Sequence, residues 1–143
     1  WGSFQSASNP CLRDVHEYLL VFSKGDYKLK RDKKERAEGR IDTIPRDDFI
    51  KHTKSIWSFP TERASRVNHP APFPVELPKR CIEMYSFVGD VVLDPFNGSG
   101  STCVAAKTTG RTYVGVDLSS DYCEIAEQRV QSAEAWVAPE VQV

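Results

Sequence analysis

The sequence predicts an α/β fold in which the chain forms part of a doubly wound, mostly parallel sheet. Two short apolar runs, Val91–Leu93 and Thr112–Val116, have the β-branched composition of central strands. A glycine turn at Gly98–Gly100 follows the first run, and stretches compatible with helices follow both. The alternation of helix and strand requires parallel strands joined by a right-handed crossover. We therefore expect the nucleotide-binding half of a doubly wound sheet.

The amino-terminal half contributes one further expected strand. His16–Phe22 (HEYLLVF) is a compact apolar run between polar residues, which is typical of a buried strand. Lys24–Lys54 then holds 11 Lys or Arg and 7 Asp or Glu with few large apolar side chains, so it cannot build a core alone. We expect a charged, partly helical excursion there, after which Trp57 and Phe59 restore apolar character.

The carboxyl-terminal half is more regular. One helix is expected over 75–88, before the first strand, and another over 101–109, where Gly110 is a helix stop. The last helix is expected to begin with the capping-box pair Asp121 and Glu124. Its inner stripe consists of Tyr122, Ile125, Ala126, Val130 and Ala133.

Length and composition restrict the class of protein. A chain of 143 residues with 40% hydrophobic and 27% charged residues is typical of one globular domain. No apolar run approaches the ~20 residues that span a bilayer, so we expect no membrane association and a cytoplasmic location. The cysteines lack a CxxC pair or a nearby histidine cluster, so we expect buried, reduced thiols and no metal site. They are Cys11, Cys81, Cys103 and Cys123.

The net charge of −1 hides an uneven distribution. Residues 1–68 carry 14 Lys or Arg against 10 Asp or Glu, whereas residues 69–143 carry 5 against 10. Since surfaces that contact phosphates need cations, the first half is the better candidate for nucleic-acid contact. Mixed charge runs also cover solvated surfaces, so this alternative stays open.

Two acids and a glycine turn form the constellation that points to a ligand. In VVLDPFNGSGST, a strand ends in Asp94 and turns through Gly98 and Gly100, where a backbone without Cβ atoms can approach a ligand. Asp117 ends the second strand, where an acid can accept both hydroxyls of a ribose. An acid on the turn would repel a pyrophosphate, and the chain has no complete GxGxxG. A cationic nucleoside such as S-adenosylmethionine fits better. The alternative is that Asp94 starts a turn and Asp117 caps a helix.

The same motifs resemble those of a known family. DPFNGSGST, preceded by HPAPFPVELPKRCI (His69–Ile82), resembles the paired cofactor motifs of the amino-group DNA methyltransferases, in the permuted order that puts the catalytic motif first. The opening GSFQSASNPCLRDVHEYLLVFSKG (Gly2–Gly25) is similar to the stretch downstream of that catalytic motif, and VGVDLS (Val114–Ser119) to the strand with the ribose acid. Only about 26–56 is left unaligned.

The resemblance implies a Rossmann-like methyltransferase sheet and a set of S-adenosylmethionine contacts. The methionine end would be lined by Asp94, Phe96, Gly98 and Gly100. Asp117 would take the ribose, and Leu118 would lie against the adenine. The pocket would be closed by His69, Ala71 and Phe73. On this basis residues 1–25 are expected to be a strand segment, 26–60 a charged excursion that contacts DNA, and 61–143 the S-adenosylmethionine-binding subdomain.

The family's catalytic motif is absent. It consists of Asp, Ser or Asn followed by Pro-Pro and an aromatic residue that stacks on the flipped base, and this chain has no Pro-Pro pair. We therefore expect no catalytic residues here and no strands from around that motif. A missing amino-terminal portion or a complementary polypeptide would supply them, and the exposed sheet edge would also allow self-association.

The resemblance implies double-stranded DNA as substrate, in restriction–modification or in regulatory methylation. The methylated atom would be adenine N6 or cytosine N4, with adenine favoured as the commoner activity. The excursion residues expected to contact DNA are Lys28, Lys30, Arg31, Lys33 and Lys34. Two alternatives remain: a non-catalytic module that binds S-adenosylmethionine or a nucleotide and assembles with a partner, and a dehydrogenase-type dinucleotide domain.

Overall fold

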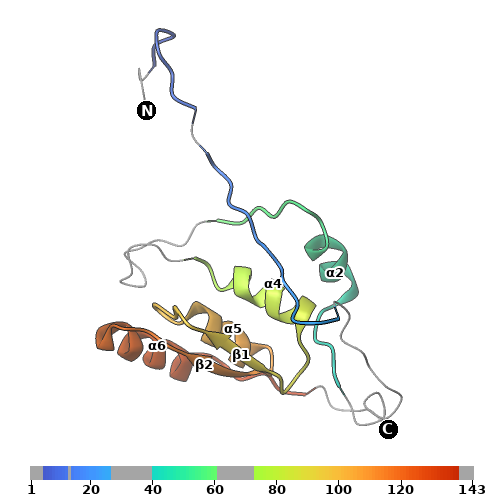
Figure 1. Ribbon diagram of the computed structural model, residues 1–143. Coiled ribbons are helices and arrows are strands. Elements are labelled where there is room, and N and C mark those ends of the chain that lie inside the picture. Colours follow the sequence, from blue (N-terminus) through green and yellow to red (C-terminus); the bar gives the residue numbers. More distant parts are fainter. Residues whose placement is uncertain (1–4, 13, 27–39, 61–72, 139–143) are drawn as a thin grey trace. The chain divides into compact units, whose positions relative to one another are not determined.

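The computed structural model divides the chain into two compact units, Trp1–Asp32 and Lys33–Val143. The boundaries expected from the sequence, after residues 25 and 60, differ from this division. The described residues are 5–12, 14–26, 40–60 and 73–138 (Figure 1).

The described residues of the first unit form no helix and no strand. The strand expected at His16–Phe22 is therefore absent: the segment is irregular, with Tyr18 at 84% and Phe22 at 85% exposure. A strand exchanges backbone hydrogen bonds with a neighbouring strand, and the described part of this unit offers no such neighbour. The prediction was wrong here because an apolar run shows only that a segment can form a strand. It does not show that a neighbouring strand is present to pair with it.

The second unit is built around two parallel strands, β1 (Val91–Asp94) and β2 (Thr112–Gly115). Val91 lies opposite Thr112, and Asp94 lies opposite Gly115. The connection between them contains helix α5 (Ser101–Thr108), which begins directly after the glycine turn. The two expected strands, their parallel pairing and the intervening helix are thus confirmed.

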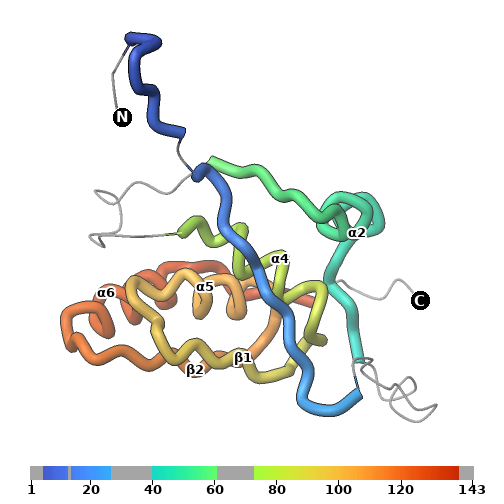
Figure 2. The backbone as a smooth tube through the Cα atoms, turned by 45° about the horizontal axis from the view of Figure 1, so that its top comes forward, coloured from blue at the N-terminus to red at the C-terminus, as the bar shows by residue number. Residues whose placement is uncertain are grey.

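Helix α5 lies at the centre of this unit. It contacts both strands, α4 (Glu76–Tyr85) and α6 (Ser120–Ser132), as the tube view shows (Figure 2). Small side chains on α5 allow these close approaches: Ala105 and Ala106 are fully buried. The core that they form also contains Ile82, Val75 and Val92. No helix among the described residues is long and apolar enough to cross a membrane.

The ends of α5 and α6 test the expected stop and start signals. Gly110 follows α5 with φ +79°, as expected of a helix stop. The capping box expected at Asp121 and Glu124 is wrong, since the cap of α6 is Ser119, whose Oγ accepts from the Tyr122 amide at 3.4 Å. The hydroxyl of Ser119 stands one turn before that amide, which is the usual capping geometry. The inner stripe holds, with Ala126 and Val130 buried.

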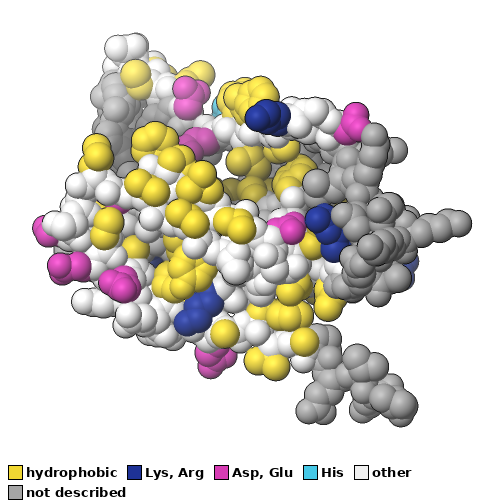
Figure 3. Space-filling model, turned by 60° about the horizontal axis from the view of Figure 1, so that its bottom comes forward, with side chains coloured by type: hydrophobic (Ala, Val, Ile, Leu, Met, Phe, Trp, Pro, Cys, Tyr) yellow, Lys and Arg dark blue, Asp and Glu magenta, His cyan; other side chains and the backbone are white. Residues whose placement is uncertain are grey.

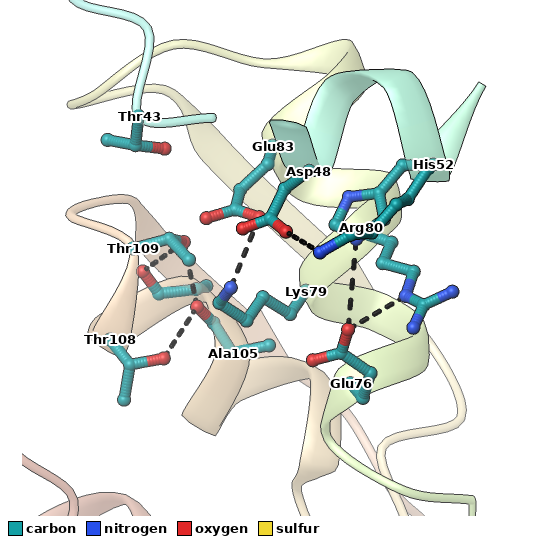
Figure 4. Close-up of polar contacts among 12 residues, drawn as sticks. Thr43, Asp48, His52, Glu76, Lys79, Arg80, Glu83, Ala105, Thr108 and Thr109 are labelled. Atoms are coloured by element: carbon teal, nitrogen blue, oxygen red, sulfur yellow. Dashed lines mark hydrogen bonds and ion pairs between the residues drawn. The ribbon is translucent and has the colours of Figure 1, made fainter. Parts of the chain in front are cut away.

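Residues 40–60, expected as an excursion without a core, pack onto α4. Helix α2 (Arg46–His52) places His52 in a buried position, with Nε2 3.9 Å from Oε1 of Glu76 (Figure 4). The same carboxylate accepts from Nε of Arg80 at 2.8 Å. The Arg80 guanidinium lies over the Trp57 ring, 5.5 Å from its centroid. This segment therefore uses polar and aromatic contacts, which hydrophobic content alone did not reveal.

A buried arginine joins the same segment to the sheet. Arg111 is 3% exposed and precedes β2. Its guanidinium donates to Oγ1 of Thr43 at 2.6 Å, to the Ser86 carbonyl at 2.6 Å and to the Thr109 carbonyl. Buried guanidinium groups need such acceptors, because an unpaired charge in the interior is costly. The bond to Thr43 spans 68 residues of sequence and joins residues 40–60 to the chain just before β2.

One face of the strand pair stays open. Val92 points into the core, whereas Val91 and Leu93 on the other face are 68% and 62% exposed, and Val114 is 48% exposed. The space-filling view shows hydrophobic side chains gathered on one face of the molecule (Figure 3). Parallel sheets are normally covered on both faces. The described residues therefore cover only one of the two faces of this sheet.

Candidate functional site

The two acids singled out in the sequence lie at the same edge of the sheet. Asp94 is the last residue of β1, and Asp117 follows the end of β2 by two residues. Because the strands are parallel and in register, their carboxyl ends meet at one edge. In open α/β sheets this edge is the usual place for a ligand.

A hydrogen bond joins the glycine turn to the second acid. The Gly98 amide donates to Oδ2 of Asp117 at 2.8 Å, across 19 residues of sequence. One residue earlier, the Asn97 amide donates to the Val116 carbonyl at 2.9 Å. Oδ1 of Asp117 accepts from the Ser119 amide at 2.9 Å. Asp117 therefore orders both the turn and the start of α6, a role that the sequence reasoning missed.

These bonds fix the orientation of the Asp117 carboxylate. Each carboxylate oxygen has two lone pairs, and each oxygen accepts one of the two backbone bonds just described. The side chain is half-buried. Its orientation is thus set by the backbone.

Asp94 carries the second negative charge of this edge. Its Oδ1 accepts from the Phe96 amide at 3.0 Å, and Oδ2 receives no hydrogen bond from the described residues. Burial, and secondly the charge of Asp94, raise the pKa of the Cys103 thiol to about 11. This thiol is consequently protonated at neutral pH and donates to Oδ1 of Asn97 at 3.1 Å. The negative charge of Asp94 therefore acts on groups next to the glycine turn, and it would stabilise a cationic ligand bound there.

Gly100 is required by packing within the protein. Its φ is +82°, and a Cβ placed there would lie 2.7 Å from Cβ and 2.9 Å from Cα of Ala126 on α6. The missing Cβ at Gly100 therefore makes room for helix α6, and the expected contact of this position with a ligand stays a prediction. Close helix packing is also the usual reason for the last glycine of a nucleotide-binding turn.

Apolar side chains at the site are exposed. Phe96 is 87% exposed and Leu118 fully exposed, so neither belongs to the core. Phe73 is 39% exposed, and its carbonyl accepts from Oγ of Ser101 at 3.2 Å, which joins the approach to α4 to the start of α5. The expected contacts His69 and Ala71 lie outside the described residues.

The expected DNA-contacting residues also lie outside the described part of the chain. They are Lys28, Lys30, Arg31, Lys33 and Lys34.

Arg129 on α6 is a site residue that sequence reasoning missed. Its Nη1 donates to the Ser99 carbonyl at 2.5 Å and to Oγ of Ser99 at 2.8 Å. The spacing offers one signal: Arg129 lies three residues after Ala126, so both occupy the face of α6 that meets the glycine turn.

The cysteines only partly match expectation. Cys103 is buried, but Cys11 and Cys123 are exposed, so the expectation of buried thiols is wrong for these two. Burial of a thiol follows from its place in the fold, which residue type alone does not fix. Within the described ranges, no group of three or more His, Cys, Asp or Glu side chains could hold a metal ion.

Comparisons with known proteins agree with this geometry. A family model described as DNA methylase matches residues 2–128. The type II methyltransferase M.MthZI of Methanothermobacter thermautotrophicus is 33% identical over 138 residues, which make up 90% of this chain and 38% of that protein. The orphan methyltransferase M.BamHII of Bacillus amyloliquefaciens is 30% identical over 144 residues, covering 82% of this chain and 54% of that protein.

A similar structure is also known. It belongs to a protein described as a DNA modification methylase of Thermus thermophilus, solved in complex with S-adenosyl-L-methionine. The match has a TM-score of 0.59 and 32% sequence identity, and covers 83% of this chain and 49% of that one. The chain thus spans between 38% and 54% of the length of these relatives.

The packing of Gly100 can be tested against a matched glycine. Gly89 has nearly the same φ, +85°, but a Cβ there would meet nothing within 4 Å. Gly89→Ala should lower the free energy of unfolding by about 1–2 kcal/mol, from backbone strain alone. Gly100→Ala should cost about 1–3 kcal/mol more, because Ala126 must also move. Urea denaturation of both variants measures the difference, and equal losses would contradict the close approach of α6.

Proposed function

Because the chain belongs to the DNA methylase family, we propose that it is the S-adenosylmethionine-binding part of a DNA methyltransferase that modifies an exocyclic amino group. The acceptor is adenine N6 or cytosine N4. The observation that carries the proposal is the pairing of two acids with an ordered glycine turn at the carboxyl edge of parallel strands. A doubly wound sheet binds nucleotides at this edge.

The residues present suit this cofactor. Asp94, with one oxygen not used by the described residues, faces the cationic methionine end. Asp117, whose carboxylate is oriented by the Gly98 and Ser119 amides at the end of β2, accepts the two ribose hydroxyls. Phe96 and Leu118, both exposed, cover the apolar parts of the ligand. Gly98 lines the methionine end beside them, and in this scheme His69, Ala71 and Phe73 close the pocket. When bound, S-adenosylmethionine supplies a methyl group on a positively charged sulfur.

The catalytic motif comes from elsewhere in this proposal. The chain is a carboxyl-terminal portion in the permuted order, and a complementary polypeptide or a preceding portion contributes the Pro-Pro-aromatic motif. Two observations support this: the chain spans only 38% to 54% of the length of these relatives, and Val91 and Leu93 leave one sheet face uncovered. The missing motif also favours a second candidate, a non-catalytic cofactor-binding module.

The charge of Asp94 can be removed without disturbing the turn. In Asp94→Asn the amide oxygen still accepts from the Phe96 amide, but the negative charge is lost. We expect S-adenosylmethionine binding to weaken by about 10-fold, as for loss of a charge-assisted contact. Ligand-observed NMR at millimolar cofactor measures the affinity. Asp121→Asn, the same change at an exposed acid in the first turn of α6, is the control, and equal affinities for both variants would refute a role for Asp94.

The purified chain should bind S-adenosylmethionine with a Kd weaker than about 0.1 mM and transfer no methyl group to duplex DNA by itself. Its open sheet face lacks cover, and the base-binding motif is absent. Transfer of a radiolabelled methyl group should begin when a polypeptide carrying the Pro-Pro-aromatic motif is added. Methylation by the chain alone would contradict the proposal, whereas cofactor binding with no activity in any assembly would favour the non-catalytic module.

The charged excursion is proposed to contact DNA phosphates in the assembled enzyme. Replacing its five cations by Gln should reduce the slope of log binding constant against log salt by about 4.5, since each phosphate contact contributes about 0.9. The variant residues are Lys28, Lys30, Arg31, Lys33 and Lys34. Lys54→Gln, at an exposed residue beyond α2, is the control. An unchanged slope in the fivefold variant would show that this run is a solvated surface.

A further inference from the structure

The guanidinium group of Arg129 contacts the glycine turn at Ser99. It donates to the Ser99 carbonyl at 2.5 Å, to Oγ of Ser99 at 2.8 Å and to Oγ of Ser101 at 3.4 Å. Both serines are 5% exposed. Asp117 holds the amide of Gly98, the residue just before Ser99. Two adjacent residues of the turn are thus held by charged side chains. The carboxylate of Asp117 accepts a hydrogen bond from Gly98, and the guanidinium of Arg129 donates hydrogen bonds to Ser99.

Ser101 connects Arg129 to the segment that precedes α4. Its Oγ accepts from Arg129 and donates to the Phe73 carbonyl at 3.2 Å. Phe73 lies just before α4, in the stretch proposed to close the cofactor pocket. The start of α4 is therefore joined through Ser101 to the turn and to α6.

We propose that Arg129 is a positioning residue, which holds the glycine turn and, through Ser101, the approach to α4 in the conformation that accepts the cofactor. The inference rests on the proposed function for its ligand, but the ordering of the turn stands without it. Arginine suits this task, because a planar guanidinium presents several donors in a fixed geometry to a carbonyl and two hydroxyls.

A separate hydrogen bond, made by Lys107, joins α5 to α6 away from the turn. Nζ of Lys107 on α5 donates to the Val130 carbonyl near the end of α6 at 2.7 Å, without contacting the turn. Lys107→Gln is therefore a matched control: it removes a charged donor between the same two helices. A merely structural role for Arg129 predicts the same consequences from both substitutions.

Amide hydrogen exchange in the free protein tests the ordering. In Arg129→Gln, exchange at the Gly98 and Gly100 amides should rise by about 10-fold, since charge-assisted hydrogen bonds that close the turn are lost. Arg129→Lys should recover part of the protection, because its ammonium can still reach one acceptor. Lys107→Gln should leave these two amides unchanged. Unaltered exchange in Arg129→Gln, or an equal rise in Lys107→Gln, would overturn the proposal.

Ser101→Ala tests the connection to α4 separately. It should raise exchange at the Leu77 amide, which donates to the Pro74 carbonyl in the first turn of α4, while Gly98 remains protected by Asp117. An unchanged Leu77 amide would remove the connection from the proposal.

Cofactor affinity separates this inference from the proposed function. Ligand-observed NMR with S-adenosylmethionine should give about 10-fold weaker binding for Arg129→Gln than for the unchanged chain, and no change for Lys107→Gln. Equal affinity in all three would overturn the positioning role. If the unchanged chain binds no S-adenosylmethionine but the exchange results are as expected, the cofactor assignment fails, and the ordering of the turn by Arg129 is upheld.

Discussion

The bond from the Gly98 amide to the Asp117 carboxylate is the interaction on which the rest of the site depends. It joins the turn after β1 to the chain leaving β2, across 19 residues. Strand pairing brings the two carboxyl ends to one edge, but pairing alone leaves the turn free to adopt many forms. The carboxylate selects one of them, because an amide donor directed at a charged acceptor makes a stronger bond than one directed at a neutral group.

Close packing restricts the turn further. Gly100 touches Ala126, and a Cβ on Gly115 would come within 2.5 Å of the Asn97 side chain. The shape of the turn is therefore determined by protein contacts before any ligand arrives, which reduces the ordering that binding would require. The exposed Phe96 and Leu118 stand apart from this packing. The site thus combines an ordered polar edge with apolar side chains that the described residues leave uncovered.

The two faces of the strand pair differ in kind. One packs on α5 through Val92, while Val91 and Leu93 point away from the core. Residues 40–60 add a polar layer outside α4, where His52 is buried and Arg111 reaches back to Thr43. This layer stabilises the existing face and does not cover the open one. Membership of the DNA methylase family and the greater length of the relatives agree with a sheet completed by further chain.

The sequence alone determined the strands, the helices of the carboxyl-terminal half, the glycine turn and the two acids, because periodicity and turn residues act over a few neighbouring positions. Local patterns could not reveal the bond of Asp117 to Gly98, the contact of Arg129 with Ser99 or the packing of residues 40–60. They also wrongly predicted a strand at His16–Phe22, since a strand forms only where a neighbouring strand pairs with it. Tertiary structure decided these features because each depends on groups far apart in the chain, whose approach is set by the packing of whole elements.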